Sequence, residues 1–317
     1  MILPRTVQTP VMLHPAGPAA SPLASLGWVL LGISVVVVLV VSVLVLVAAL
    51  RARQEGAAVS RSGQGLTWIV VGGLAVPAVI LTFVFVLTVR TLGAAAVPSH
   101  SAATIEVVGH RWWWEVRYRD SLSASITTTA NELHVPTGQP VRLELSTADV
   151  IHSFWVPELA GKTDLIPGQH NVAWVQADHP GVYWGTCGEY CGLEHARMQL
   201  TVVAESPAAF RRWLDQQRQP AGLASASAMA GQALVTDGAC ALCHTIRGTA
   251  AGGALGPDLT HVASRRMLAA GTVANTRGGL AAWIANPHAL KPGTAMPAVG
   301  LSGPELQAVV AYLETLR

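Results

Sequence analysis

Two long uncharged runs dominate the N-terminal third of the chain. Residues 25–50 and 66–89 contain no charged side chain, and neither run has the polar face of a helix that packs on a soluble core. A helix needs about 20 apolar residues to cross the hydrocarbon core of a bilayer. The pattern therefore predicts a transmembrane helical hairpin over residues 25–90 rather than two buried helices of a soluble protein.

Arginines predict the orientation of this hairpin. Arg51, Arg53 and Arg61 lie in the short connection between the two runs, and short loops rich in basic residues stay on the cytoplasmic side of a membrane. Both termini, and everything after residue 90, are then expected outside. Residues 1–24 form an external N-terminal segment whose five prolines make it unlike a cleavable signal peptide.

Short alternating runs follow between residues 98 and 205. In residues 114–118 and 141–145, large apolar side chains alternate with charged ones, and a period of two is typical of strands with one buried face. Turn signals with proline and glycine separate the runs. The pattern predicts an all-β domain, an antiparallel sandwich or barrel of about 100 residues.

Helical patterns dominate the rest of the chain. A short helix and a linker rich in alanine, serine and glycine are expected over residues 206–230, followed by a small all-α domain over residues 231–317. Ser302 and Glu305 form a capping-box pattern at the start of the last helix. That helix has one apolar face, made of Leu306, Val309, Val310 and Leu313.

Composition narrows the class of protein. Only 12% of the 317 residues are charged and 51% are hydrophobic, with a net charge of +2 and a mean hydropathy of +0.43. A soluble domain usually carries about 25% charged residues. These values exclude a disordered chain, a nucleic-acid-binding protein and an ordinary cytosolic enzyme.

A first group of metal-binding side chains falls within twelve residues. The thiolate, imidazole and thioether ligands of this group come from Cys187, Cys191, His195 and Met198. Such a soft set of ligands suits copper better than calcium or magnesium. A closed zinc site more often has a two-residue cysteine spacing. A disulfide between the two cysteines is the remaining alternative. His152, in a strand-like run before a proline turn, is the candidate for a further ligand, although a lone histidine there is more often structural.

A second group predicts a haem. Cys240-Ala-Leu-Cys243-His244 is the pattern of covalent haem c attachment, in which both cysteines bind the porphyrin and the histidine binds iron. Residues 291–297, Lys-Pro-Gly-Thr-Ala-Met-Pro, resemble the loop of class I cytochromes c that supplies the second iron ligand, here Met296. Residues 256–259 also resemble that family.

Two other residues compete with Met296. Met267 lies in a segment expected to be helical, and His261 is a further candidate for the sixth iron ligand. A histidine–methionine pair gives haem a higher potential than two histidines. All four cysteines are used by the two groups, two for copper and two for haem, which leaves none for a disulfide.

Four segments of the chain resemble subunit II of the haem–copper cytochrome c oxidases. They are residues 152–157, 162–168 and 187–198 and the aromatic segment 109–114. The resemblance covers residues 25–205 and implies a cupredoxin fold with the binuclear copper centre CuA. It implies six ligands for the two copper ions: His152, Cys187, the backbone carbonyl of Glu189, Cys191, His195 and Met198.

The same resemblance assigns roles within this set. The two sulfurs would bridge both ions, each imidazole would bind one ion, and the methionine and the carbonyl would be weak ligands. The Glu189 side chain would reach a magnesium ion at the interface with subunit I. Trp112 would be the residue through which electrons enter CuA.

A CuA domain followed by a cytochrome c domain resembles the caa-type oxidases. The resemblance implies a subunit of cytochrome c oxidase in a bacterial cell membrane, bound to lipid, to subunit I and to other oxidase subunits. Electrons would pass from cytochrome c or a quinol–cytochrome c reductase to haem c, then to CuA, and then to subunit I, which reduces oxygen and pumps protons.

Two alternatives stay open, a CuA-bearing subunit of a nitric oxide reductase and a stand-alone membrane-anchored electron carrier. One departure from the family is the lack of a glutamate in residues 64–68, just before the second apolar run. The resemblance therefore assigns no residue of this chain to proton uptake.

Overall fold

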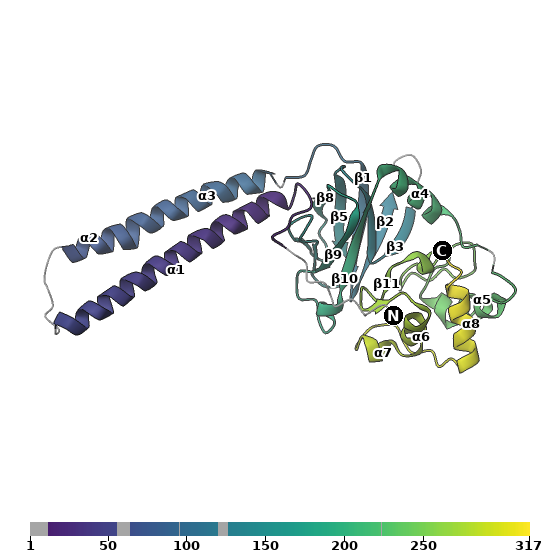
Figure 1. The fold of residues 1–317 in the computed structure, drawn as a ribbon. Helices are drawn as coiled ribbons and strands as arrows, with labels where there is room; N and C mark the ends of the chain where they lie inside the picture. Colours follow the sequence, from purple (N-terminus) through teal and green to yellow (C-terminus); the bar gives the residue numbers. More distant parts are fainter. Residues whose placement is uncertain (1–11, 56–63, 95, 120–125, 223) are drawn as a thin grey trace. The chain divides into compact units, whose positions relative to one another are not determined.

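The computed structural model describes residues 12–55, 64–94, 96–119, 126–222 and 224–317. The chain forms two compact units (Figure 1). One unit comprises residues 20–96, and the other comprises residues 1–19 together with residues 97–317.

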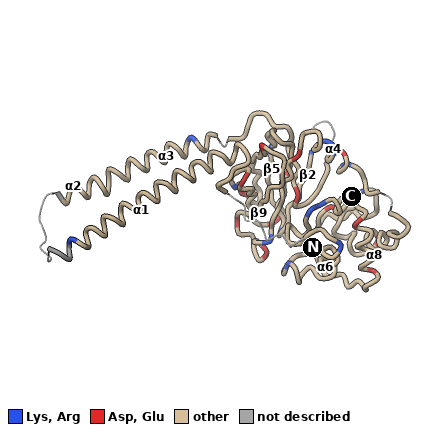
Figure 2. The backbone as a smooth tube through the Cα atoms, viewed as in Figure 1, with Lys and Arg blue, Asp and Glu red and all other residues tan. Residues whose placement is uncertain are grey.

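The first unit is a pair of long apolar helices. Helix α1 spans Ser21–Glu55, and the second helical segment comprises α2 (Gln64–Val70), the π-helical turn η1 (Val71–Ala75) and α3 (Val76–Ala94). Both helices are long and apolar enough to cross a membrane, and Figure 2 shows them uncharged over nearly their whole length. The two predicted apolar helices are confirmed. Arg61 and the side chain of Arg53 lie outside the described residues, so the orientation stays a prediction.

Pro77 follows the π-helical turn directly. A proline inside an α-helix lacks the N–H for its hydrogen bond, and its ring collides with the carbonyl four residues back. Here the preceding residue, Val76, donates its N–H to the carbonyl of Val71, five residues back. The wider turn explains how the helix accommodates the proline, since π-turns and neighbouring helices relieve such clashes.

The second unit begins with a sandwich of two five-stranded sheets, here called the β-sandwich domain. The first sheet has the strand order β3-β2-β1-β5-β8, with bounds β1 Ala103–His110, β2 Trp113–Arg119, β3 Ile126–Ala130, β5 Val141–Thr147 and β8 Asn171–Val175. The second has the order β4-β10-β9-β6-β7, with bounds β4 Glu132–Pro136, β6 His152–Trp155, β7 Thr163–Leu165, β9 Gly181–Cys187 and β10 Gln199–Glu205.

Alternation along the strands builds the core as predicted. Trp114, Val116 and Tyr118 on β2 are buried while the residues between them are half-exposed. Strand β5 buries Val141 and Leu143 in the same way. Successive side chains of a strand point to opposite faces, so one face of each strand fills the space between the sheets.

The expectation of an antiparallel sandwich is wrong in one respect, because both sheets are mixed. Strand β1 pairs in parallel with β5, and β10 pairs in parallel with β4. The chain leaves β1, adds β2 and β3 on one side, crosses to the other sheet as β4, and returns to the free edge of β1 as β5. That return brings two strands together in the same direction, which local alternation does not reveal.

The last 90 residues form a helical domain, here called the C-terminal helical domain. Its helices and short strands are α5 Met229–Thr236, η3 Ala239–Leu242, η4 Val262–Ser264, β11 Met267–Leu268, β12 Val273–Ala274, α6 Arg277–Ala285, α7 Pro287–Leu290 and α8 Gly303–Leu313. Ser302 and Glu305 form the predicted capping box of α8. Met267 lies in a two-stranded sheet with Ala274 rather than in the expected helix.

The segment that joins the two domains is hydrogen-bonded to the C-terminal helical domain. Helix α4 (Pro207–Arg218) confirms the predicted short helix. After it, the N–H of Ala221 donates to the carbonyl of Arg247 (2.8 Å), and the Arg247 guanidinium donates to the carbonyls of Gln217 and Arg218. Helix α5 begins at Met229, inside the predicted linker. Backbone hydrogen bonds of this kind have no signature in composition.

A buried histidine ties α4 to the second sheet. His134 on β4 lies 3.0 Å from a carboxylate oxygen of Glu132 and 3.3 Å from one of Glu205. The ring of Trp213, on α4, stacks on the imidazole at 3.9 Å. Burial alone would lower the pKa of His134, but the hydrogen bonds to the two carboxylates outweigh it and raise the pKa. The same contacts hold the pKa of Glu132 and of Glu205 below its usual value.

Removing this imidazole should destabilise the β-sandwich domain. Because the folded-state pKa of His134 is raised, its contribution is full below about pH 6.5, the usual histidine value, and is lost as the pH rises through the folded value. We expect His134→Gln to lower the free energy of unfolding by about 3 kcal/mol at pH 6, and to flatten its decline at higher pH. Urea titration of the detergent-solubilised chain, followed by tryptophan fluorescence, measures this.

The matched control is His170→Gln, which removes an exposed histidine of the same domain. A wild-type pH dependence that survives unchanged in His134→Gln would contradict this assignment.

Candidate metal centres

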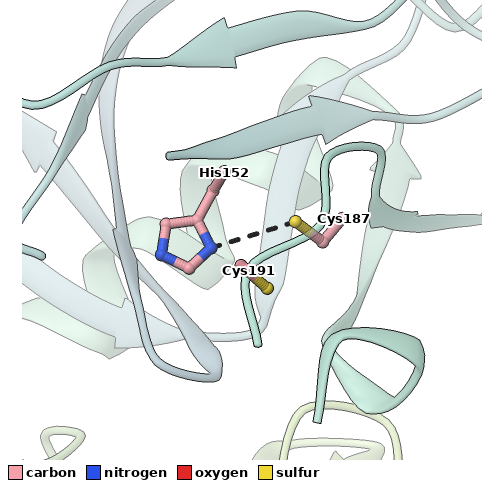
Figure 3. A group of neighbouring side chains, drawn as sticks. All are labelled: His152, Cys187 and Cys191. Carbon is pink, nitrogen blue, oxygen red and sulfur yellow. Dashed lines mark hydrogen bonds between the residues drawn. The ribbon is translucent and has the colours of Figure 1, made fainter. Parts of the chain in front are cut away.

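Strand pairing brings the first group of ligand candidates together. His152 is the first residue of β6 and Cys187 is the last residue of β9, and these strands pair with Phe154 opposite Cys187. Cys191 lies in the loop that follows β9. The ligand atoms of His152, Cys187 and Cys191 all lie within 4.8 Å of one another, and Figure 3 shows the imidazole and the two sulfur atoms around one space.

The other three predicted ligands lie beside these sulfurs. The Sγ atom of Cys191 is 3.6 Å from Nδ1 of His195 and 3.8 Å from Sδ of Met198. The Sγ atom of Cys187 is 3.1 Å from the carbonyl oxygen of Glu189. The structure therefore gathers all six predicted residues into one cluster, in which His152, both cysteines and Met198 are buried and Glu189 and His195 are half-buried. Two thiols, two imidazoles and a thioether form a donor set that suits copper, so the residues present fit a copper centre.

The two thiols share their protons unequally. A hydrogen bond from the Cys191 thiol lowers the pKa of Cys187, against the effect of burial, and the same contact raises the pKa of Cys191. The Cys187 thiol is therefore the more acidic of the two, and the Cys191 thiol holds its proton more tightly. Metal binding requires both sulfurs as thiolates, so filling the site would release that proton.

A carboxylate that sequence reasoning missed orients His152. Nε2 of the imidazole lies 2.8 Å from Oδ1 of Asp149, so Nδ1 faces the sulfur of Cys187, at 3.9 Å. Asp149 is itself held by the N–H groups of Arg111 and Val150. A carboxylate on the far nitrogen fixes the ring and makes it a better metal ligand. The only signal in the sequence is an aspartate three residues before the histidine.

The backbone of β1 packs closely against the imidazole of His152 and restricts its position. A Cβ atom added at Gly109, on β1, would lie 2.8 Å from Cδ2 of His152. Glycine at this point lets the first sheet approach the ring, which is 0% exposed.

The three consecutive tryptophans occupy three different environments. Trp112 is half-buried, and its Nε1–H donates to the carbonyl of Cys191 (2.9 Å). Trp113 stacks on His110 at 4.3 Å, and Trp114 is fully buried against Phe154. Among the three, Trp112 alone is hydrogen-bonded to the cysteine loop in the described structure. Its role in electron transfer stays a prediction.

The second group surrounds His244 in the C-terminal helical domain. Cys240 lies on η3, and Cys243 and His244 follow it. Nδ1 of His244 lies 2.7 Å from the carbonyl of Pro257. Burial lowers the pKa of His244, so the ring is neutral, donates from Nδ1, and has Nε2 available for a metal.

The surroundings of His244 fit a haem. A Cβ atom at Gly256 would lie 2.6 Å from the imidazole, so the backbone of residues 256–257 packs directly on the ring. Leu242, two residues before the half-buried His244, and Leu255, next to Gly256, are 74% and 79% exposed. A flat apolar cofactor bound at His244 would cover them. Met296 is half-buried in the loop after α7.

The competing iron ligands are otherwise engaged. His261 is buried, with Nδ1 2.8 Å from the carbonyl of Arg317 and Nε2 3.0 Å from that of Gln219. Both ring nitrogens are therefore used in the fold, and His261 has none for iron. Met267 lies on the strand β11.

The residues near Glu189 do not form a magnesium site on their own. The Glu189 carboxylate pairs with Nζ of Lys162 at 3.1 Å. Magnesium prefers six oxygen ligands, and in the described part of the chain this carboxylate is held by a lysine instead. A magnesium ion here would need most of its ligands from another subunit.

Comparison with known proteins divides the chain in the same way as its two metal groups. The family model for "Cytochrome C oxidase subunit II, periplasmic domain" matches residues 122–205, and that for "Cytochrome c" matches residues 228–317. These matches agree with the cupredoxin-like sandwich and the helical cytochrome c domain expected from the sequence.

Curated proteins similar to this chain are named as subunit 2 of cytochrome c oxidase. "Cytochrome c oxidase subunit 2" of Alkalihalophilus pseudofirmus is 36% identical over 67% of this chain and 61% of its own length. The protein of that name from Bacillus subtilis is 29% identical over 69% of this chain and 64% of its own length. The chain thus spans about three fifths of the length of these curated relatives.

Solved structures that resemble the chain include the periplasmic domain of subunit II of cytochrome oxidase (CoxB) of Bradyrhizobium japonicum. It is 28% identical, covers 39% of this chain and 97% of its own, and has a TM-score of 0.35. A chain of a "heme-copper terminal oxidase dimer" is 22% identical, covers 42% of this chain and 97% of its own, and has a TM-score of 0.33.

Removing the charge of Asp149 should weaken metal binding without unfolding the domain. Asp149→Asn keeps the size of the side chain but loses the carboxylate on Nε2 of His152, and such changes cost about 10- to 100-fold in metal affinity. Competition with a copper chelator measures the affinity, and circular dichroism checks the fold. Asp178→Asn, in the same domain, is the control. Equal copper affinity in Asp149→Asn and wild type would argue against His152 as a ligand.

Proposed function

We propose that this chain, which joins a domain of the cytochrome c oxidase subunit II family at residues 122–205 to a cytochrome c domain at residues 228–317, is the electron-transfer subunit of a respiratory haem–copper oxidase. The observation that carries the proposal is the assembly of two separate metal-binding groups on one chain. The soft cluster at His152, Cys187 and Cys191 fits copper, and the His244 site fits haem.

Six residues would hold the copper centre CuA: His152, Cys187, the Glu189 carbonyl, Cys191, His195 and Met198. When bound, the copper centre would supply a one-electron carrier at this place in the β-sandwich domain. The chain keeps the ligands rigid. Asp149 fixes one imidazole, Met198 is 0% exposed, and both cysteines are buried, so water is kept from the three sulfur atoms. Fixed ligands in a dry site keep the structural change on electron transfer small.

Four residues would hold haem c. Cys240 and Cys243 would form the covalent bonds, with His244 and Met296 as the iron ligands. When bound, the haem supplies a second one-electron carrier, and its histidine–methionine ligation favours a high potential. The Pro257 carbonyl holds the tautomer of His244 through Nδ1. Support for Met296 over its competitors comes from the engagement of both nitrogens of His261.

The proposed path runs from cytochrome c, or a quinol–cytochrome c reductase, to haem c, to CuA by way of Trp112, and on to subunit I. Subunit I would reduce oxygen to water and pump protons. The two apolar helices would anchor the chain in a bacterial cell membrane, among lipid and other oxidase subunits, with both termini and both metal centres on the outer side. Two spans also favour a subunit of a complex, because a carrier that needs only an anchor requires one.

Purification of the chain in mild detergent with its accompanying subunits tests this function. We expect copper and haem c on this chain, a-type haem in the partner, and oxygen consumption with reduced cytochrome c. Nitric oxide consumption with b-type haem alone would place the chain in a nitric oxide reductase. Recovery of the loaded chain without any partner would show a stand-alone carrier.

A reciprocal pair of variants tests the two metal assignments. Cys243→Ser should prevent normal two-bond haem attachment. It should leave copper bound, because Cys243 lies in the C-terminal helical domain and the copper ligands lie in the β-sandwich domain. Cys187→Ser should abolish the copper centre and leave the haem spectrum unchanged. Metal analysis and optical spectra of both proteins measure the result. A Cys243→Ser protein with an unshifted c-type spectrum would refute the haem assignment.

A further inference from the structure

A buried lysine connects the two domains of the second unit. Lys291 is one of only two lysines in the chain and is 2% exposed. Its Nζ donates to the carbonyls of Trp112 (2.8 Å) and Arg197 (2.8 Å), both in the β-sandwich domain, and to that of Ala269 (3.1 Å) in its own domain. Each N–H of the ammonium group therefore has one carbonyl acceptor.

Such an arrangement must be specific, since burying a charge is costly. Burial lowers the pKa of Lys291 to about 7, and nearby Glu194 opposes that shift. A buried ammonium without acceptors would lose its hydration and gain nothing. The three carbonyls replace the lost water, and two of them exist at this place only when the domains are in contact.

The loop that begins at Lys291 lies against Trp112. A Cβ atom at Gly293 would lie 2.9 Å from Cδ2 of Leu193 and 3.7 Å from the Trp112 ring. On the copper-loop side, a Cβ atom at Gly192 would lie 3.2 Å from the same ring. Both glycines have positive φ, of 81° and 115°, a conformation that other residues rarely adopt. The Trp112 ring therefore lies between the cysteine loop and the loop that carries Met296.

Further contacts extend this interface on the same side of the β-sandwich domain. The N–H of Gln199, on β10, donates to the carbonyl of Ala270 (3.0 Å). The N–H of Arg266 donates to the carboxylate of Glu132 (3.0 Å). Both domains belong to one compact unit. The contact is thus built from several hydrogen bonds, two of which come from Lys291.

We propose that Lys291 is a latch that fixes the C-terminal helical domain on the β-sandwich domain and holds the Met296 loop against Trp112. The effect of the latch on electron transfer rests on the proposed function. Trp112 takes electrons from the haem of its own chain, because the Met296 loop packs against its half-buried ring. An outside donor must then reduce haem c first. Lys291 acts here as a positioning residue, through the loop that it holds.

Amine labelling tests the latch without any substitution. The full-length chain, with copper and haem bound, is treated with an acylating reagent and mapped by mass spectrometry. Lys162, whose side chain is 48% exposed, is the internal control. We expect Lys291 to react about 100-fold more slowly than Lys162, because it reacts only after local opening. Equal labelling rates would overturn the latch.

Electron-transfer kinetics test its consequence. Lys291→Met keeps the length of the side chain and removes the ammonium, and loss of hydrogen bonds to a charged group should lower the docking equilibrium about 10- to 100-fold. We expect the haem-to-copper electron transfer to slow, while the spectra and potentials of both centres stay unchanged. Arg277→Met, which removes a surface cation that pairs with Glu314, is the control.

The outcomes separate this proposal from the proposed function. Absence of copper and haem from the wild-type chain would refute the function itself. A loaded chain whose Lys291→Met variant transfers electrons at the wild-type rate would refute the latch alone. A loss of haem ligation in Lys291→Met would also refute it, since Lys291 would then support the haem site rather than docking.

Discussion

The register between β6 and β9 is the constraint on which the copper cluster depends. Pairing of Phe154 with Cys187 places His152 at the end of one strand beside the last residue of the other. A shift by one residue would turn every side chain of β6 to the opposite face, and the imidazole would leave the sulfurs. Gly109 and Asp149 then fix the ring from both sides. The fold thus sets the positions of these side chains relative to one another.

Buried charges mark the places where separate elements meet. His134 on β4 pairs with Glu205 of β10 and stacks on Trp213 of α4, and Lys291 joins the two domains through main-chain carbonyls. Each group costs free energy unless all its partners are present, so each is satisfied in one arrangement only. Apolar packing alone would tolerate a range of domain orientations. The polar contacts select one of them.

The parts of the protein that depend on neighbouring residues could be predicted from the sequence. The apolar runs gave the helices, the alternation at Trp114 and Val116 gave a strand with one buried face, and the spacing of Cys187 and Cys191 gave the soft cluster. The parallel pairing of β1 with β5 could not be predicted, because it depends on strands far apart in sequence. Nor could the partners of Lys291, since backbone carbonyls are the same at every residue. The ligand roles themselves stay predictions.

The hydrogen bonds of the segment between α4 and α5 limit how far its length can change. A flexible tether absorbs inserted residues cheaply, at about 0.6 kcal/mol for each doubling of its length. Here Nε2 of His261 lies 3.0 Å from the Gln219 carbonyl and Ala221 donates to Arg247, so the chain is fixed to the helical domain within three residues of the end of α4. An insertion at this point would have to form a new surface loop or break those bonds. The connection between α4 and α5 therefore has a preferred length.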